Sequence, residues 1–303
     1  MLPNIFIIGA PKCGTTALSC YLASHPNISM SVPKEPMYFL TDYPKLRLVQ
    51  DERSYLKCFN PKKSADIRAL GEASALYLVS EEAIKNIIAF NPDSKIIVMI
   101  RNPISMALSL HAQNVFYGDE DKENFADAWN SQISRRSGQC TPRTCRDPIL
   151  LDYEKNCKLG SLLARLYLQV PEEQINVILL DDLLKSPGNT YAETLQFLNL
   201  PHDRKTLFAI INERKAPRNI FLNRMLSSPP RPIRFLVNIV KRSLNMRSLG
   251  LHKMIVKMNS RKLEVNGIDP EVHDMLQEVF SEDINILSDV IKRDLSCWKK
   301  PLN

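Results

Sequence analysis

Runs of consecutive large apolar residues mark the predicted β-strands of this chain. The runs are 5–8, 95–100 and 175–180, and the stretch 67–70 is interpreted as a further strand. Unbroken apolar runs, as opposed to alternating ones, are typical of parallel strands covered on both faces. Apolar residues between the runs recur at helical spacing. The alternation predicts an α/β fold: a P-loop-like three-layer sandwich with a mainly parallel central sheet and helices on both faces.

Capping residues and prolines indicate where the predicted helices begin. Ser80 is followed by two acids and begins one helix. Asp269 is followed by proline and begins an amphipathic helix over 269–280. A second helix is expected over 284–298. The polar stretch 131–148 predicts a mobile loop.

The turn between the first strand and the first helix carries a phosphate-binding signal. Gly9 and Gly14 bracket it, Lys12 lies inside it, and Thr15 and Thr16 begin the helix. The first N–H groups of a helix have no internal partner and lie at the positive end of its dipole, so they bind phosphate. The pattern departs from the ATP/GTP loop G-x-x-x-x-G-K-[ST], because threonine follows the second glycine. We expect a cradle for a 5′-phosphate, although a purely structural turn would also fit this stretch alone.

The sequence Lys12-Cys13-Gly14-Thr15-Thr16 resembles the loop of the sulfotransferase superfamily. That loop holds the 5′-phosphosulfate of 3′-phosphoadenosine 5′-phosphosulfate (PAPS). Within the superfamily the match is more similar to the bacterial and heparan-type branch than to the cytosolic phenol and steroid branch. The resemblance implies that these five residues bind the cofactor. It also implies that Lys12 stabilises the leaving phosphate oxygen, with no metal needed.

Arg101 and Ser109 form a second candidate anion site. Arg101 directly follows the strand 95–100, and Ser109 lies on the helix that Pro103 begins. Both can converge at the carboxyl end of the strand, where ligands collect in open α/β sheets. Arg101 alone could equally be part of a surface salt bridge. A strand followed by Arg-x-Pro and then Ser resembles the superfamily's site for the 3′-phosphate of the cofactor, which assigns both residues to cofactor binding.

The two prolines around Lys34 and Glu35 predict a rigid, extended loop. The pair could be a solvated surface ion pair. It could also supply a general base, since an acceptor hydroxyl must lose its proton as it attacks sulfur. Heparan-type sulfotransferases carry a catalytic Glu followed by an aromatic pair here, and Glu35 with Tyr38 and Phe39 resembles that pattern. The resemblance therefore makes Glu35 the base.

Contacts with the acceptor are expected around this loop and around residues 71–77. The segment Gly71 to Tyr77 resembles the superfamily's Gly-Glu-x-[ST]-Pro-x-Tyr, with Ala75 where proline is usual. His111 could be a base, as in the cytosolic branch, but packing or an acceptor contact is favoured. The predicted acceptor-binding residues are Lys34, Tyr38, Phe39, Ser74, Tyr77 and His111.

The formal net charge of +7 is concentrated in one segment. Thirteen Lys or Arg and no acid lie between Glu213 and Glu264, so 7 minus 13 leaves −6 for the rest. The resemblance to sulfotransferases implies that a basic segment after the last core helix closes over the 3′-phosphate of the cofactor, and Arg218 and then Lys215 are the expected contacts. The basic segment 219–262 could be a lid-like insertion, a peripheral membrane contact through 231–262, or a solvated face. Nucleic-acid binding is not expected, because interleaved aromatic residues are missing.

Composition narrows the cellular setting. The chain contains no run of about 18 apolar residues, so no transmembrane helix is expected. The N-terminus lacks the features of a secretory signal. The chain has seven cysteines, an odd number, which favours cytoplasmic thiols. Cys140 and Cys145 could pair, but their spacing has no second half that would make a zinc site.

Together these features predict one sulfotransferase domain over 1–303, with the C-terminal helices over 263–303 packed on the core. The expected reaction is in-line transfer of the sulfuryl group of PAPS to a hydroxyl or amine of a small metabolite or natural product, in the cytoplasm. A saccharide or glycolipid is the alternative acceptor. A P-loop kinase or nucleotide-binding protein is the alternative from another class. The oligomeric state is left open.

Overall fold

The computed structural model describes residues 1–59, 66–209, 215–217, 260–262 and 269–299. The chain divides into two compact units. The first consists of Met1–Ala107, Glu154–Asn212 and Asp269–Asn303, and the second of Leu108–Tyr153 and Glu213–Ile268. The single domain expected over 1–303 stays a prediction.

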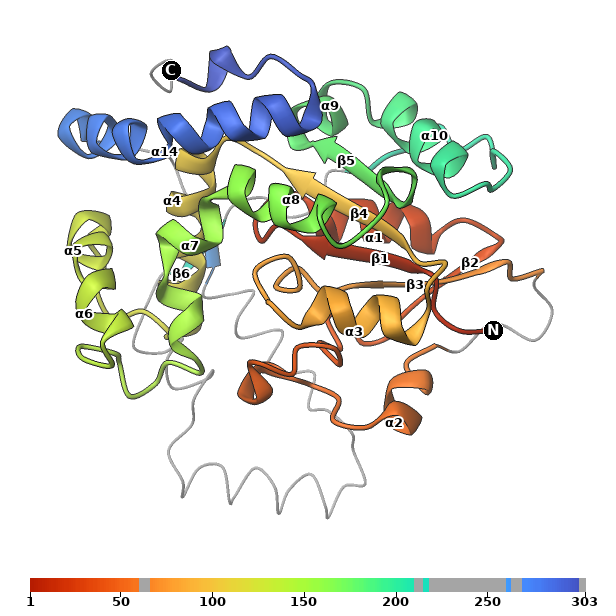
Figure 1. The fold of residues 1–303 in the computed structure, drawn as a ribbon, viewed down its shortest axis with the longest axis horizontal. Helices are drawn as coiled ribbons and strands as arrows, with labels where there is room; N and C mark the ends of the chain where they lie inside the picture. The colour runs from red at the N-terminus through yellow and green to blue at the C-terminus, as the bar shows by residue number, and fades with distance from the viewer. Residues whose placement is uncertain (60–65, 210–214, 218–259, 263–268, 300–303) are drawn as a thin grey trace. The chain divides into compact units, whose positions relative to one another are not determined.

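The first unit is built on a five-stranded sheet in which each neighbouring pair is parallel (Figure 1). The strand order is β2-β3-β1-β4-β5. The strands are β1 (Ile5–Gly9), β2 (Ile28–Met30), β3 (Ala69–Ala73), β4 (Lys95–Ile100) and β5 (Ile175–Leu179). β1 and β3 are buried along their whole length, as parallel strands covered on both faces must be. The predicted α/β fold is confirmed.

The direction of each crossover decides which face of the sheet a helix covers. The crossover from β1 through α1 (Thr15–Ala23) leads outward to β2, whereas the crossover from β3 through α3 (Ala83–Phe90) leads the opposite way to β4. Since such crossovers are right-handed, α1 and α3 cover opposite faces. The crossover from β4 to β5 brings α8 (Leu159–Tyr167) to the face of α3 (Figure 1).

The C-terminal helix α14 (Pro270–Ile291) packs on α8. The buried carboxylate of Asp283 accepts hydrogen bonds from the N–H groups of Gly160 and Ser161 and from Ser161 Oγ, at 2.6–2.8 Å. A Cβ on Gly160 would lie 2.1 Å from the backbone oxygen of Asp283. Glycine therefore permits the close approach of the two helices.

The tail differs from the two helices expected over 269–280 and 284–298. Asp269 caps the helix as predicted, by accepting from the N–H of Glu271. The helix then continues without a break to Ile291, because Phe280, Ile284 and Leu287 form one buried stripe. It ends at Lys292, which adopts a left-handed conformation, and the 3₁₀ turn η4 (Ser296–Lys299) follows.

The second unit contains ion pairs where the sequence predicted a mobile loop over 131–148. Arg135 is 3% exposed and makes a bidentate ion pair with the buried Glu120. Glu120 also accepts from the Tyr153 hydroxyl, and Arg146 makes a bidentate ion pair with Asp119. Because α6 forms within the stretch, the expectation of a loop was wrong over 132–136, and the mobility of the remainder stays a prediction. The helices here are α5 (Phe125–Asn130), α6 (Gln132–Arg136) and the 3₁₀ turn η2 (Pro148–Leu151).

Short elements complete the described chain. Those of the first unit are η1 (Pro44–Leu46), α2 (Glu52–Leu56), η3 (Glu172–Gln174), α9 (Leu180–Lys185) and α10 (Pro187–Phe197). α4 (Pro103–Tyr117) and α7 (Tyr153–Cys157) run across the division between the units. In the second unit β6 (Lys215–Pro217) pairs antiparallel with β7 (Ser260–Lys262).

Candidate functional site

Because the sheet is parallel, the carboxyl ends of its strands meet along one edge. The loop 10–14 leaves β1 at this edge, the loop 31–40 leaves β2, and Arg101 follows β4. Backbone hydrogen bonds join neighbouring strand ends at this edge. Ser74, just after β3, donates its N–H to the Ile7 carbonyl of β1 at 3.0 Å, and Ala10, just after β1, donates its N–H to the Met99 carbonyl of β4 at 2.7 Å. The structure thus places Lys12, Glu35 and Arg101 at the same edge of the sheet.

The phosphate-type turn has the local geometry that the glycine pattern requires. Gly14 precedes α1 with φ of 88°, and a Cβ there would lie 2.7 Å from Leu180 Cδ1. No acidic residue occupies the first turn of α1, so nothing on this helix offsets the positive end of its dipole. Lys12 and Thr16 are partly exposed, whereas Thr15 is buried.

Cys13 is a packing residue within this turn. Its side chain is 0% exposed and lies 3.7 Å from Met106 Sδ. Burial raises the pKa of the thiol to about 12, although the charge of Arg101 acts in the opposite direction. A cofactor could therefore contact Cys13 only through its backbone.

Arg101 contacts the phosphate-type turn directly. Its Nη1 donates to the Lys12 carbonyl at 3.2 Å, which ties the end of β4 to the loop after β1. The next residue, Asn102, accepts from the N–H of Ile104 in the first turn of α4. Ser109 lies farther along α4, in the second unit and partly exposed. The pairing of Arg101 with Ser109 at one phosphate stays a prediction.

The loop 31–40 is fixed to β3 and to the segment that follows it. Glu35 N–H donates to the Ala73 carbonyl at 3.2 Å. Met37 N–H donates to Ser74 Oγ and Phe39 N–H to the Tyr77 hydroxyl, each at 3.2 Å. Ser74 and Tyr77, predicted as acceptor contacts, are both 0% exposed. In this structure they support the loop from below.

Glu35 is presented at the surface of this loop. It has φ of 61°, a left-handed conformation that turns the chain sharply between the two prolines. Its Oε1 lies 2.5 Å from Lys34 Nζ, and the side chains are 37% and 27% exposed respectively. The carboxylate is thus paired but accessible, as a group that must meet a substrate has to be.

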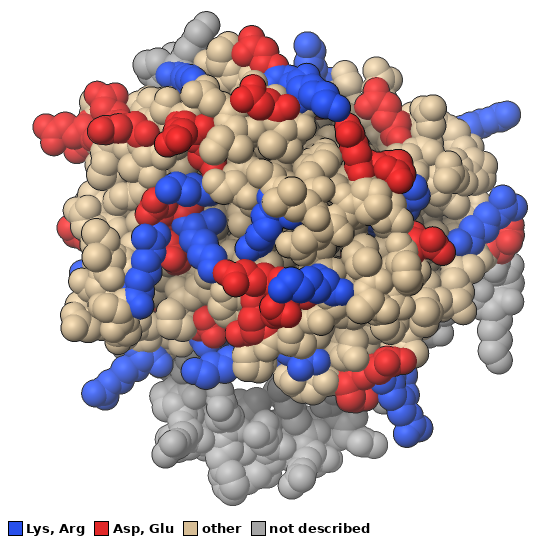
Figure 2. All heavy atoms as spheres, viewed as in Figure 1, with Lys and Arg blue, Asp and Glu red and all other residues tan. Residues whose placement is uncertain are grey.

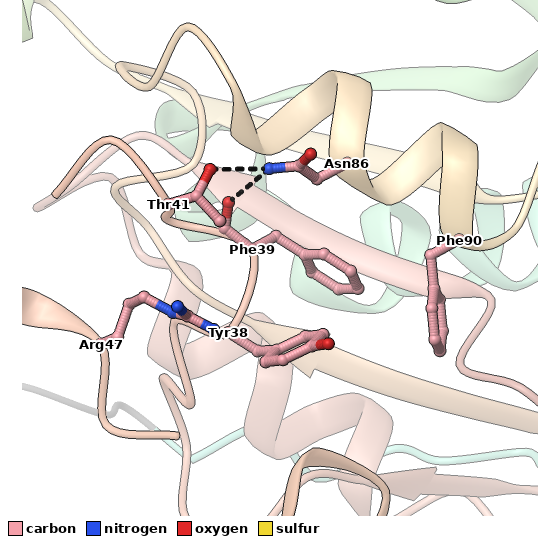
Figure 3. A pocket seen from close by; sticks show the side chains of 6 residues that line it. All are labelled: Tyr38, Phe39, Thr41, Arg47, Asn86 and Phe90. Atoms are coloured by element: carbon pink, nitrogen blue, oxygen red, sulfur yellow. Dashed lines mark hydrogen bonds between the residues drawn. The ribbon is translucent and has the colours of Figure 1, made fainter. Parts of the chain in front are cut away.

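Tyr38 and Phe39 belong to an aromatic cluster below the loop. Tyr38 stacks on Tyr55 with ring centroids 4.6 Å apart and an angle of 14°. Phe39 contacts the rings of Tyr55, Tyr77 and Phe90 edge-on. The pocket of Figure 3 opens beside these rings. It is lined by Tyr38, Phe39, Thr41, Arg47, Asn86 and Phe90.

This pocket is small. Its volume of about 230 Å³ is below the ~300–1,000 Å³ usual for sites that enclose small molecules. Asn86 Nδ2 already donates to the Phe39 carbonyl and to Thr41 Oγ1, as Figure 3 shows. The Arg47 guanidinium lies 5.4 Å from the centre of the Tyr38 ring. The pocket therefore does not have the size of a nucleotide site.

His111 is buried in the second unit. One ring nitrogen lies 2.8 Å from the Lys122 carbonyl, and the ring packs against Phe125 and Tyr153. Burial lowers the pKa of its imidazole. These surroundings favour the packing role over a catalytic one, and its contact with an acceptor stays a prediction.

The remaining predicted contacts, Lys215 and Arg218, belong to the start of the stretch Glu213–Ile268 of the second unit. The backbone of Lys215 lies in β6, opposite Lys262 of β7. Arg218 lies outside the described residues, as does most of the basic segment 219–262.

On the face that Figure 2 shows, Lys and Arg lie among Asp and Glu. Within the described ranges no helix combines the length and apolarity needed to cross a membrane.

Sequence reasoning gave no role to two buried residues beneath the loop, Tyr55 and Glu72. Both are 0% exposed. Glu72 could have been singled out, because an acid in the middle of the strand sequence Ala-Leu-Gly-Glu-Ala is unusual inside a buried sheet. Tyr55 gave no such signal, since it lies in a short helix within a polar stretch.

Known proteins are similar to this chain in sequence and in fold. The family model described as "Sulfotransferase domain" matches residues 2–216. Human heparan sulfate glucosamine 3-O-sulfotransferase 6 is 32% identical over 113 residues, which are 37% of this chain and 31% of that protein. The membrane-associated sulfotransferase kil1 of Dictyostelium discoideum is 32% identical over 109 residues, 36% of this chain and 22% of that protein. The match thus spans less than a third of either relative.

A solved structure shares the fold over the whole chain. The sulfotransferase from Alicyclobacillus acidocaldarius superposes with a TM-score of 0.71 at 23% identity, covering 99% of this chain and 100% of that one. The prediction from the phosphate-type turn is therefore confirmed at the level of fold and family. The family match covers well over half of the chain, and the protein belongs to the sulfotransferase domain family.

Proposed function

We propose that this protein transfers the sulfuryl group of PAPS to a hydroxyl or amine of a small metabolite or natural product. The observation that carries the proposal is that two loops leave the sheet at the same edge. The loop 10–14 presents Lys12 beside the N-terminus of α1, and the loop 31–40 presents Glu35. A cation next to free helical N–H groups fits a phosphate, and an accessible carboxylate fits a proton acceptor.

Each residue has a defined part in the proposed transfer. Glu35 takes the proton of the acceptor hydroxyl as the hydroxyl oxygen forms a bond to sulfur. The bond from sulfur to the 5′-phosphate oxygen breaks, and Lys12 stabilises the charge that develops on that oxygen. The N–H groups of Gly14, Thr15 and Thr16 hold the 5′-phosphate. Most of the rate then comes from positioning and charge neutralisation.

Arg101 is proposed to distinguish this donor from ATP. Its guanidinium already lies against the phosphate-type turn, through the 3.2 Å contact with the Lys12 carbonyl. A planar guanidinium binds phosphate oxygens in pairs. Together with the predicted contacts Ser109, Lys215 and Arg218, it is proposed to hold the 3′-phosphate that ATP lacks.

Calorimetric titration with 3′-phosphoadenosine 5′-phosphate, against ATP with Mg²⁺, tests the cofactor. We expect binding of the bisphosphate only, weakened at least tenfold in Arg101→Ala. Arg68→Ala is the matched control, because that exposed arginine pairs with Asp66 instead. Preference for ATP with Mg²⁺ would replace this proposal by the P-loop kinase. Binding of neither nucleotide would overturn both.

A saccharide acceptor is the second candidate, because the human relative is by name a heparan sulfate glucosamine 3-O-sulfotransferase. Transfer of labelled sulfate from PAPS to a glucosamine oligosaccharide, compared with a panel of small alcohols and amines, separates the two acceptor classes.

For the location of the protein we propose the cytoplasm. The odd number of cysteines in the sequence favours free thiols, as the cytoplasm maintains. All seven lie in the described part of the chain and are free thiols there, Cys140 and Cys145 included.

A further inference from the structure

Glu72 is a buried acid at the centre of the cluster that supports the Glu35 loop. It lies on β3 in register with Phe6 of β1, and its side chain is 0% exposed. Among the described residues, no hydrogen bond of ordinary geometry reaches either of its carboxyl oxygens. Burial raises the pKa of Glu72 to about 7, while the hydroxyls of Tyr55, Tyr77 and Ser74 act in the opposite direction. A carboxyl with this environment needs an explanation.

Two of the surrounding hydroxyls also hold the loop. Ser74 Oγ accepts from the N–H of Met37, and the Tyr77 hydroxyl accepts from the N–H of Phe39. A hydroxyl has one hydrogen to donate besides the lone pairs it uses as an acceptor. Both hydroxyls are buried, so these hydrogens must point into the protein. Glu72 is the acid that lies among them.

Tyr55 extends the same cluster to Tyr38. The Tyr55 hydroxyl is buried and, within the described residues, has no hydrogen-bond partner. Its interaction with Glu72 raises the pKa of Tyr55, after the larger effect of burial. Its ring stacks on Tyr38, three residues after Glu35. Three side chains that contact the loop at residues 37, 38 and 39 thus share one buried carboxyl.

We propose that Glu72 is a positioning residue, whose carboxyl orients the hydroxyls of Ser74, Tyr77 and Tyr55 so that they hold the loop carrying Glu35. The proposed influence runs electrostatically from Glu72 to the hydroxyls, and then through the hydrogen bonds of Ser74 and Tyr77 to the backbone N–H groups of the loop. Only the last step, from loop position to the reaction, rests on the proposed function. The anchoring itself does not.

Hydrogen exchange of the loop tests the anchoring without substrate. Glu72→Gln replaces one acceptor oxygen by an NH2 donor in a side chain of similar shape, and Glu193→Gln removes an acid from the exposed face of α10 as the matched control. We expect amide exchange at Met37 and Phe39 to become at least fivefold faster in Glu72→Gln only, with residues 14–18 unchanged. Equal exchange in the two variants would overturn the proposal.

A second measurement uses the unmodified protein, so that it holds even where Glu72→Gln does not fold. The titratable groups that face Glu72 are Tyr55, Tyr77 and Cys58, and burial raises the pKa of each. Glu72 therefore changes charge first as the pH rises. A carboxylate only accepts hydrogen bonds, so ionised Glu72 should draw the hydroxyl hydrogens toward itself and leave the hydroxyl oxygens to accept from the loop N–H groups. Protection of the Met37 and Phe39 amides from exchange, corrected for intrinsic exchange rates, should therefore be higher at pH 8 than at pH 6. Protection that is equal at the two pH values, or lower at pH 8, would overturn the proposal.

Turnover connects the anchoring to the reaction. In Glu72→Gln we expect kcat to fall at least fivefold with the KM for PAPS unchanged, since the loop 10–14 is not involved. Faster loop exchange in a protein that transfers no sulfuryl group would overturn the proposed function and leave the anchoring supported. Unchanged exchange in an active sulfotransferase would do the reverse.

Discussion

Two buried carboxyl groups of the first unit, Asp283 and Glu72, differ in how their oxygens are satisfied. Asp283 lies between α14 and α8 and accepts from Gly160 N–H, Ser161 N–H and Ser161 Oγ. Glu72 lies under the Glu35 loop, and no described group reaches its oxygens at ordinary hydrogen-bond geometry. A fully bonded carboxylate fixes one arrangement of two helices.

The difference separates a structural region from a functional one. At the α8–α14 contact both carboxylate oxygens of Asp283 are hydrogen-bonded and glycine allows the backbones to touch, so the packing is rigid. At the edge of the sheet, Glu35 stays accessible and the acid beneath it can change its charge near neutral pH. Buried polar groups that lack hydrogen-bond partners occur more often at functional sites than elsewhere.

The largest effect is expected at the helix contact. Gly160→Ala would place a Cβ 2.1 Å from the Asp283 backbone oxygen and should lower the free energy of unfolding by about 3 kcal/mol or more. Denaturant titration measures the loss. Gly188→Ala in α10 is the control, because its Cβ would meet only Phe208 at an ordinary 3.6 Å. Equal stability of the two variants would show that the helix contact is not rigid.

The other side of the comparison predicts a dependence on pH. The pKa of Glu72 is raised in the folded protein from 4.5 to about 7, so the folded state binds more protons between these values. The stability that Glu72 contributes is therefore present at low pH and is lost as the pH rises to about 7, on the order of 3 kcal/mol in total.

Denaturant titrations between pH 4.5 and 8 measure this loss. The curve of Glu72→Gln should be flatter than that of the unmodified protein by about that amount. A Glu72→Gln curve parallel to the original would mean that Glu72 ionises normally, and the contrast with Asp283 would then disappear.

Glu35→Gln tests whether the supported loop carries the base. Turnover should fall roughly 10²-fold or more, as is usual when a general base is lost. That factor corresponds to about 2.7 kcal/mol of transition-state stabilisation. Binding of 3′-phosphoadenosine 5′-phosphate, measured by calorimetry, should be nearly unchanged. Undiminished turnover would remove Glu35 from this role.

The smallest effect concerns thiols and asks whether the phosphate-type turn is as closely packed as the helix contact. Cys13 is buried and the pKa of its thiol is raised to about 12, whereas Cys20, on the next turns of α1, is exposed. Iodoacetamide at pH 8 should label Cys20 within minutes and leave Cys13 unlabelled, as read by mass spectrometry of peptides. Rapid labelling of Cys13 would show that the turn opens.

The main strands could be predicted because their signal is local. The run 95–100 coincides with β4, and 5–8 and 175–180 differ from β1 and β5 by one residue at one end. β2, with only three residues, has too short a run to stand out. The strand predicted over 67–70 is β3, displaced to 69–73, because Gly71 and Glu72 do not resemble a buried strand. Only pairing with β1 and β2 makes them one.

Some features of the candidate site could likewise be predicted from the sequence, and others could not. Lys12, Glu35 and Arg101 each follow a predicted strand or lie in a proline-bounded loop, so the sequence marked them. Ser74 and Tyr77 were predicted to contact the acceptor, which stays a prediction, and the structure shows their hydroxyls bonded to the loop backbone, which the sequence did not indicate. Arg135 was assigned to a mobile loop, because nothing in its own stretch indicates the buried Glu120 that pairs with it.

The sequence by itself determined the α/β fold, the family and the turn that fits a 5′-phosphate, because apolar runs and glycine spacing act over a few residues. Tertiary structure alone decided which polar groups are buried together. Tyr55 of α2 and Glu72 of β3 come from separate segments, as do Asp283 and Gly160, and their proximity depends on how the chain folds around the sheet and on helix packing. Burial and hydrogen bonding set the charge of an acid, so the chemistry of these carboxyls could not be assigned before the fold was known.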